Sequence, residues 1–283
     1  MKENVNHSIY YFTGTGNSLR AAAVIAKSFG KTEIISMRMA PADVPAKNAG
    51  VIGFVFPVYH WTICEAIQDF IAKLEINPKA YIYAISVPSF INGFSFEALD
   101  KILREKGGAL HYGKRVFSVA NLCLVYPPMP FPKIRVPATE RKLNRIAKEL
   151  KKQKKNTYPK AGVLTRLLYS KVMPKYRDIQ SEVDKGFMVS DTCVSCGLCA
   201  KVCPKKNITI ESAKPAFLHK CSCCMACFSF CPQRAIQYRL PKEQHEKANK
   251  LLRYLMRMPE KRKCYRNPHI SAKDLMLDRL YIE

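Results

Sequence analysis

The sequence predicts an α/β fold in which a doubly wound, five-stranded parallel sheet is followed by a small, cysteine-rich α+β domain. Three observations support this prediction. In residues 1–137, short and nearly continuous apolar runs alternate with segments of helical periodicity, as expected for parallel strands covered on both faces. Nine of the twelve cysteines lie between residues 193 and 231. The stretch between these regions is basic and starts near a proline-rich break at 127–132.

The expected strands are short apolar runs bounded by polar residues, glycine or proline. They cover residues 9–12, 32–36, 51–56, 81–87 and 116–119. Because each run is apolar on both of its alternating faces, it suits a strand buried between two layers of helices. The stretch 37–50 contains two prolines and is expected to be a loop or a short helix.

The expected helices follow from apolar positions three and four residues apart and from residues that start or stop helices. The first covers about residues 19–29, and the fourth runs out into the lysines of 151–155. The start and stop signals are a capping box of Thr62 with Glu65, N-caps at Ser95 and Thr139, and stops at Gly30 and Gly107. Gly30 is expected in the left-handed helical conformation.

Two runs of cysteines share one spacing, C-x2-C-x2-C-x3-C, and each is followed by proline. The first run is Cys193, Cys196, Cys199 and Cys203, and the second is Cys221, Cys224, Cys227 and Cys231. Such runs bind [4Fe–4S] clusters, and in two-cluster ferredoxins the fourth cysteine of each run ligates the other cluster. One predicted ligand set is therefore Cys193, Cys196, Cys199 and Cys231. The other is Cys221, Cys224, Cys227 and Cys203.

Zinc and disulfide bonds are the alternatives for these cysteines. Zinc sites use four ligands in two separated pairs, whereas each run here contains four cysteines and ends in Cys-Pro. The start of the chain does not resemble a secretory leader, so a reducing, cytoplasmic and anaerobic setting is expected, where disulfides are rare. Cys223 fits neither run and is expected to have no role. Cys64 and Cys123 are expected to be buried as small apolar residues.

The composition is that of an ordinary globular protein, with 48% hydrophobic residues, but the formal net charge is +25. Residues 1–137 carry a net charge of +6 and residues 138–283 carry +19. Such a charge fits an acidic redox protein, an anionic membrane surface or nucleic acid as partner, or a basic face that is only solvated. No RNP, zinc-finger or helix-turn-helix signature supports nucleic acid. No apolar stretch is long enough to predict a transmembrane helix.

A polar, glycine-containing loop lies between the first expected strand and the first expected helix. It consists of Thr13, Gly14, Thr15, Gly16, Asn17 and Ser18. The N-terminus of a helix offers free backbone N–H groups and a partial positive charge, which together suit a phosphate group. The loop lacks the G-K-[ST] of a Walker A motif and is not G-x-G-x-x-G.

This loop resembles the phosphate-binding T-x-T-G-N-[ST] signature of flavodoxins, which bind FMN. The resemblance implies FMN at the carboxyl ends of the strands, at the switch point of the sheet. In flavodoxins the loops after the third and fourth strands enclose the flavin ring, which makes Tyr59, Trp61 and Phe90 the candidates here. The second of these loops is commonly glycine-rich in the family, whereas this chain has Pro88-Ser89-Phe90.

The chain as a whole resembles fusions of a flavodoxin-like domain with a bacterial-type two-cluster ferredoxin, over about residues 8–125 and 188–240. The expected parts are an FMN-binding domain at 1–137, a basic helical connector at 138–187, a ferredoxin domain at 188–240 and a basic helical tail at 241–283. The tail helix would present Leu251, Leu252, Leu255 and Met258 as its apolar side.

These cofactors predict an electron-transfer protein that passes single electrons between two [4Fe–4S] clusters and FMN. No residue pattern indicates an acid–base pair or an activated nucleophile. The alternative is an FMN-dependent oxidoreductase that reduces a small acceptor, such as a quinone, with electrons supplied through the clusters. A third possibility is a membrane- or nucleic-acid-associated protein that uses its basic half.

Overall fold

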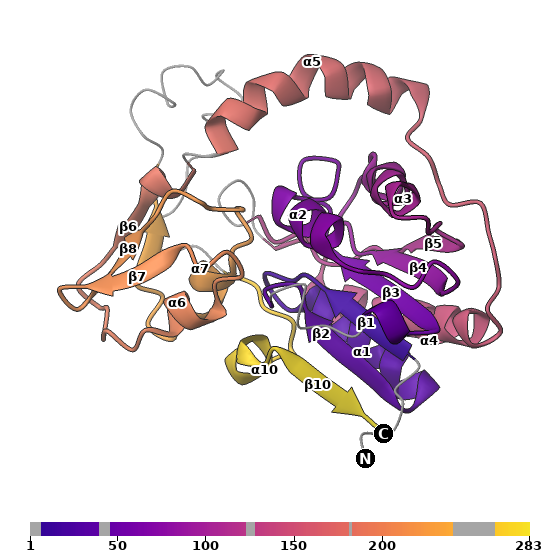
Figure 1. Cartoon of the computed structure of the whole chain (residues 1–283). Helices are drawn as coiled ribbons and strands as arrows, with labels where there is room; N and C mark the ends of the chain where they lie inside the picture. Colours follow the sequence, from indigo (N-terminus) through magenta and orange to yellow (C-terminus); the bar gives the residue numbers. More distant parts are fainter. Residues whose placement is uncertain (1–6, 40–45, 123–127, 181–182, 240–263) are drawn as a thin grey trace.

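A mostly parallel sheet covered by helices forms the larger part of the molecule, and the cysteine-rich region packs beside it (Figure 1). The computed structural model describes residues 7–39, 46–122, 128–180, 183–239 and 264–283. The predicted tail helix with Leu251 and Met258 lies outside these residues. In the described part of the chain, no helix is long and apolar enough to cross a membrane.

The central sheet has six strands in the order β10-β2-β1-β3-β4-β5. The strands are β1 (His7–Tyr11), β2 (Thr32–Ser36), β3 (Val51–Phe56), β4 (Tyr81–Ser86), β5 (Tyr112–Arg115) and β10 (Arg279–Ile282). Strands β1 to β5 are parallel, in the flavodoxin-like order 2-1-3-4-5. This confirms the predicted five-stranded, doubly wound sheet. The sixth strand, β10, pairs antiparallel with β2 and was not predicted.

The fifth strand was predicted four residues too late in the sequence. The prediction followed the apolar run at 116–119, but β5 is formed by Tyr112–Arg115. It is the edge strand of the sheet, so Lys114 and Arg115 at its end are partly or fully exposed and break the apolar pattern. Val116 and Val119 are buried in the loop that follows.

Two pairs of helices cover the two faces of the sheet. They are α1 (Asn17–Phe29) with α4 (Pro132–Lys151), and α2 (Glu65–Lys73) with α3 (Ser95–Glu105). Leu19 and Ile25 of α1 share one core with Leu143 of α4, whereas Ile67 of α2 and Leu99 of α3 belong to the core on the opposite face. Because α4 packs on the sheet and begins at Pro132, it belongs to the first layer rather than to a connector starting at 138.

The predicted capping residues do not cap their helices. Thr62 lies in a tight turn before α2, and the N-cap of that helix is Cys64, without a side-chain cap bond. Ser95 is the first residue of α3, and its hydroxyl donates to the Asn92 carbonyl at 2.6 Å. Thr139 lies inside α4 because the helix starts about two turns earlier, where Pro132 provides the fixed φ that suits a first turn.

Gly30 ends α1 as predicted, although not in the left-handed helical conformation. Its φ of 71° is positive, but its ψ of −168° is extended, and its N–H donates to the Ala26 carbonyl. The positive φ still favours glycine at this position.

The cysteine-rich region is a small α+β unit built from two similar halves. Strands β6 (Phe187–Val189) and β9 (Ile236–Tyr238) pair antiparallel, as do β7 (Ile208–Glu211) and β8 (Lys214–Phe217). One short helix lies within each run of cysteines, α6 (Leu198–Val202) and α7 (Ala226–Phe230), and each helix ends just before the fourth cysteine of its run. Apolar side chains including Phe187, Ile208, Phe228, Ile236 and Tyr238 form its core.

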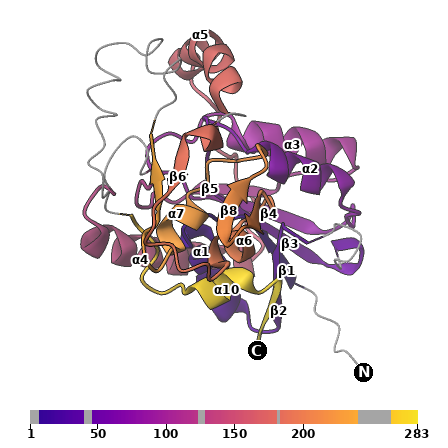
Figure 2. The same ribbon diagram turned by 90° about the vertical axis from the view of Figure 1, so that its left-hand side faces the viewer.

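Helix α5 (Val163–Gln180) spans the distance between the sheet and the cysteine-rich region (Figure 1) and stands above the other helices and strands in Figure 2. It rests on the sheet side through Tyr169, whose ring centroid lies 4.7 Å from that of Phe94, and through an ion pair of Arg166 with Glu97. Leu164 and Leu167, on the remainder of its surface, are exposed. The predicted helical connector therefore contains a helix, whose apolar residues Val163, Leu164, Leu167 and Leu168 are exposed.

The end of the chain returns to the sheet instead of continuing as a helical tail. Residues 264–283 form the short helix α10 (Ala272–Met276) and the strand β10. In Figure 1 this yellow segment passes below the junction of the two regions. The Arg38 guanidinium, just after β2, donates to the carbonyls of Lys201 in α6 and Leu275 in α10, at 2.8 and 3.1 Å. The sheet, the cysteine-rich region and the C-terminal segment thus meet at one side chain.

Candidate cofactor site

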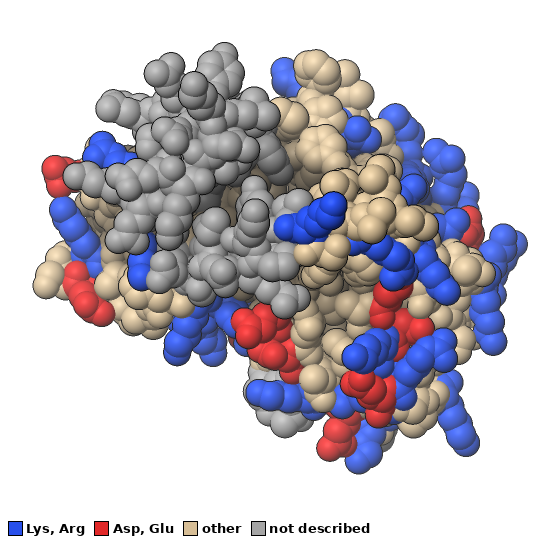
Figure 3. Space-filling view, turned by 90° about the horizontal axis from the view of Figure 1, so that it is seen from above, with Lys and Arg blue, Asp and Glu red and all other residues tan. Residues whose placement is uncertain are grey.

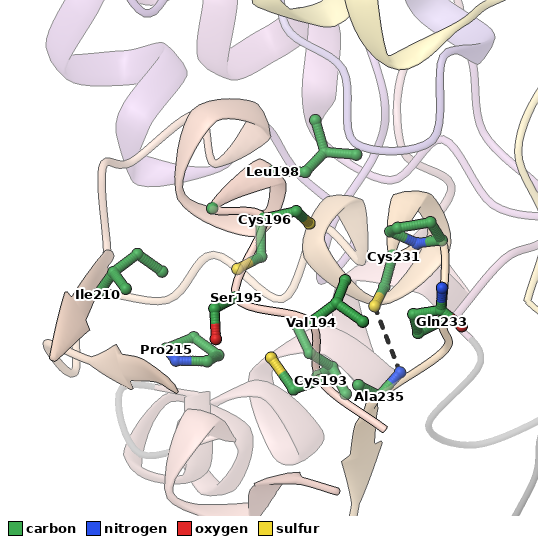
Figure 4. A pocket seen from close by; sticks show the side chains of 14 residues that line it. Cys193, Val194, Ser195, Cys196, Leu198, Ile210, Pro215, Cys231, Gln233 and Ala235 are labelled. Carbon is green, nitrogen blue, oxygen red and sulfur yellow. Dashed lines mark hydrogen bonds between the residues drawn. The ribbon is translucent and has the colours of Figure 1, made fainter. Parts of the chain in front are cut away.

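Four cysteines drawn from both runs surround one cavity, which we name the outer cavity. They are Cys193, Cys196, Cys199 and Cys231, the first of the two sets predicted from the spacing. Figure 4 shows the sulfur atoms of Cys193, Cys196 and Cys231 directed toward the same space. The Ala235 N–H donates to the Cys231 sulfur at 3.3 Å. Cys196 is exposed, so this cavity lies at the surface.

The other four cysteines surround a second cavity, the inner cavity. They are Cys203, Cys221, Cys224 and Cys227, together with apolar side chains such as Phe187, Ile208 and Phe217. Two backbone N–H groups donate to sulfur here, Asn207 to Cys203 and Cys223 to Cys221, both at 3.3 Å. Such bonds stabilise a thiolate, which is the form that binds metal.

The two cysteine runs fold alike because the same positions of each adopt positive φ. Ser195 and Cys223 have φ of 55° and 53°, and Gly197 and Met225 have φ of 67° and 63°. These left-handed residues turn the backbone so that the first three cysteines of each run face one cavity. Since non-glycine residues pay about 1 kcal/mol or more for this conformation, its repetition indicates a site that requires it.

Burial holds the inner thiols in their neutral form when no metal is bound. It raises the pKa of Cys221 to about 12 and raises the pKa of Cys224 and Cys227 well above the ordinary thiol value. Because metals bind thiolates, loading this cavity must release protons. No group of three His, Cys, Asp or Glu side chains among the described residues could hold a single metal ion.

A third cavity, of about 410 Å³, opens at the carboxyl ends of the parallel strands. We name it the sheet-edge cavity. Its walls come from the loops after β1, β3, β4 and β5, and its size is in the range of small-molecule sites. The residues of the predicted phosphate loop that line it are Thr13, Gly14, Thr15, Asn17 and Ser18. Helix α1 begins at Asn17, so the free N–H groups of its first turn lie in this wall.

The three predicted aromatic residues all line the sheet-edge cavity. Tyr59 and Trp61 stand on a tight turn in which His60 and Trp61 have φ of 49° and 62°. Phe90, on the neighbouring loop, is 54% exposed at the rim. The two loops are packed together, because a Cβ at Gly93 would overlap the Trp61 carbonyl oxygen.

Two residues of the predicted phosphate loop make contacts with the C-terminal segment that the sequence did not indicate. Gly16 does not line the cavity; it is the N-cap of α1, with a φ of 92°, and packs against Ile270. Asn17 lines the cavity, but its side-chain oxygen accepts hydrogen bonds from Tyr265 and Asn267 of the C-terminal segment. No local pattern in the sequence marks these partners, which are about 250 residues away.

Two further residues of the cavity are not among the predicted site residues. Asn121 hydrogen-bonds the Thr15 hydroxyl from the loop after β5. Cys223, which fits neither cysteine run, lines the sheet-edge cavity. The signal for Cys223 was its place between two cluster-type cysteines, at the position that Ser195 occupies in the first run.

One family model matches a part of the cysteine-rich region. Residues 188–209 match the family model of the 4Fe-4S binding domain. The order of the parallel strands is that of flavodoxins. The chain joins a flavodoxin-like domain to a ferredoxin-type region. No curated protein sequence matches it.

Several solved structures are similar to the flavodoxin-like domain, and each covers about half of this chain. The Trp repressor binding protein of Bacillus subtilis is 14% identical, with 49% of this chain and 95% of that chain covered and a TM-score of 0.38. The FMN-dependent NADH-azoreductase of Bacillus anthracis in complex with FMN is 10% identical, with 51% of this chain and 99% of that chain covered and a TM-score of 0.37. The two-electron reduced flavodoxin of Megasphaera elsdenii is 15% identical, with 50% of this chain and 98% of that chain covered and a TM-score of 0.32.

The ferredoxin-type region and the flavodoxin-like domain share a wall. Cys224 lines the inner cavity, whereas its neighbour Cys223 lines the sheet-edge cavity. On the other side of this wall lies Gly14 of the phosphate loop, so close that a Cβ there would overlap the Cys224 carbonyl oxygen. A single loop, residues 221–224, therefore separates the two cavities.

Proposed function

We propose that this chain is an electron-transfer protein that passes single electrons between two [4Fe–4S] clusters and one FMN. The observation that carries the proposal is the shared wall of residues 221–224. It puts a cavity with four cysteines directly beside a cavity with a phosphate loop. Electron transfer between bound cofactors needs such proximity, because each electron must pass from one cofactor to its neighbour.

The donor sets fit two clusters. Each cavity offers four thiols, apolar walls and at least one backbone N–H directed at sulfur. The outer cavity would use Cys193, Cys196, Cys199 and Cys231, and the inner cavity Cys203, Cys221, Cys224 and Cys227. When bound, each cluster supplies one-electron redox chemistry, whose potential depends on these hydrogen bonds and on exposure to solvent.

The sheet-edge cavity fits FMN. Thr13, Thr15 and Ser18 are buried hydroxyl-bearing residues beside the N-terminus of α1, which suits a phosphate group. Tyr59 and Trp61 would flank the flavin ring, and Phe90 would cover its exposed side. When bound, FMN accepts electrons one at a time or in pairs and so links one-electron and two-electron carriers.

The three cavities differ in their access to a partner. The inner cavity lies against the flavodoxin-like domain, whereas the outer cavity lies at the surface, near exposed Cys196 and Val194. We infer that a redox partner docks at the outer cavity. The net charge of +25 favours an acidic partner, and Lys and Arg stand out over much of the described face in Figure 3.

One observation favours the alternative of an FMN-dependent oxidoreductase. Phe90 and Ile91, at the rim of the sheet-edge cavity, are 54% and 43% exposed. An apolar rim would suit a small apolar acceptor such as a quinone, reduced at the flavin with electrons supplied through the clusters.

An anaerobic reduction experiment tests the proposed function. The full chain, loaded with clusters and FMN, receives less reductant than its cofactors can accept. We expect electrons to equilibrate between clusters and flavin within one molecule, observed as cluster signals in electron paramagnetic resonance together with loss of flavin fluorescence. Clusters that become reduced while the flavin stays oxidised, although the flavin alone accepts electrons from the same reductant, would contradict the proposal. Sustained turnover with a soluble quinone would favour the oxidoreductase instead.

A further inference from the structure

The C-terminal segment makes direct contact with the phosphate loop. The Tyr265 hydroxyl donates to the side-chain oxygen of Asn17 at 2.9 Å, and the side-chain amide of Asn267 donates to the same oxygen at 3.1 Å. The Asn267 backbone N–H donates to the Thr15 carbonyl at 2.8 Å. Tyr265 and Asn267 are only 6% and 4% exposed, so water does not compete freely for these bonds.

These contacts fix the first residue of helix α1. The Asn17 side-chain amide donates to the Val119 carbonyl at 3.4 Å, so the carboxamide is held from two sides. Gly16, directly before it, packs against Ile270 of the same segment. The start of α1 and the direction of its free N–H groups are therefore set by residues from the other end of the chain.

The segment is itself held firmly in place. The Asn267 side-chain oxygen accepts from the His269 N–H at 3.1 Å, and a capping box of Ser271 and Asp274 starts α10. Strand β10 then pairs with β2 along its length. A rigid support of this kind can orient a binding loop, since its own position does not depend on the ligand.

We propose that Tyr265 and Asn267 are positioning residues of the FMN phosphate site. They act through Asn17 and Thr15 and keep the first turn of α1 in the conformation that receives the phosphate. The inference rests on the proposed function, because it requires FMN in the sheet-edge cavity. It adds that affinity for the phosphate depends on the last twenty residues of the chain, which contain no flavodoxin signature.

Binding of FMN and of riboflavin, which lacks the phosphate, tests this inference. Both are titrated into the flavin-free full chain carrying Tyr265→Phe or Asn267→Ala. Each variant removes a buried hydrogen bond to Asn17, so we expect the Kd for FMN to rise about tenfold. The Kd for riboflavin should stay within about twofold of that of the unaltered chain, because the ring site is untouched.

A matched control lies on the same segment. Tyr281→Phe removes an exposed hydroxyl from β10 and should leave both affinities unchanged. Unchanged FMN affinity in both test variants, or equal weakening of FMN and riboflavin, would overturn the positioning role. If the unaltered chain binds riboflavin and FMN with equal affinity, the phosphate group contributes nothing to binding and the inference fails. If it binds neither, the FMN part of the proposed function fails as well.

Discussion

Replacing Gly14 by alanine should abolish FMN binding and weaken the junction of the two regions. The added Cβ would overlap the Cys224 carbonyl oxygen, a backbone atom that cannot turn aside like a side chain. Either the phosphate loop or the 221–224 loop must move. We expect a loss of about 2 kcal/mol or more in the free energy of unfolding, as for overpacking elsewhere. Titration with FMN measures the loss of binding, and denaturant unfolding of the protein loaded with clusters measures the loss of stability.

Gly162→Ala provides the control for this prediction. No atom lies within 4 Å of the position that its Cβ would take, so neither FMN affinity nor stability should fall. If Gly14→Ala bound FMN as tightly as the unaltered protein, the close contact between the phosphate loop and Cys224 would be wrong, and so would the shared wall.

Replacing Cys196 by serine should remove one cluster and leave the flavin in place. Cys196 belongs to the outer cavity, which does not adjoin the sheet-edge cavity. We expect about four of eight irons to remain, with an unchanged amount of bound FMN. Iron and flavin analyses of the same anaerobic sample measure this. Electron exchange between the remaining cluster and the flavin should persist.

The control for Cys196→Ser is Cys264→Ser, because Cys264 lines none of the three cavities. It should retain all the iron and flavin. Loss of iron and flavin together from Cys196→Ser would show that the outer and sheet-edge cavities are not independent. Full iron content in Cys196→Ser would remove Cys196 from the ligand set.

The central strands could be predicted from the sequence, whereas the edges of the sheet could not. Runs such as 51–56 are buried on both faces, so every residue is apolar and the pattern is plain. Strand β5 lies at an edge, where Lys114 and Arg115 interrupt it. Strand β10 has only four residues and is stabilised by pairing with β2, together with an ion pair of Arg279 with Glu33. Such long-range pairing leaves no local pattern.

The two cysteine sets could be predicted because the spacing within each run is local and because two-cluster ferredoxins exchange the fourth cysteine between their runs. The structure brings together the same two sets of four. The hydrogen bonds from Tyr265 and Asn267 to the phosphate loop could not be predicted, since they depend on where the end of the chain packs. The close approach of Gly14 to Cys224 depends in the same way on the docking of the two regions.

The central claim is that two iron–sulfur clusters and a flavin occupy three neighbouring cavities of one chain. The most direct test is to measure iron, acid-labile sulfide, zinc and flavin in one sample reconstituted without oxygen, together with its absorption spectrum. The claim predicts about eight irons, about eight sulfides and one flavin per chain, with a coloured protein. A colourless protein that binds zinc in place of iron would contradict it.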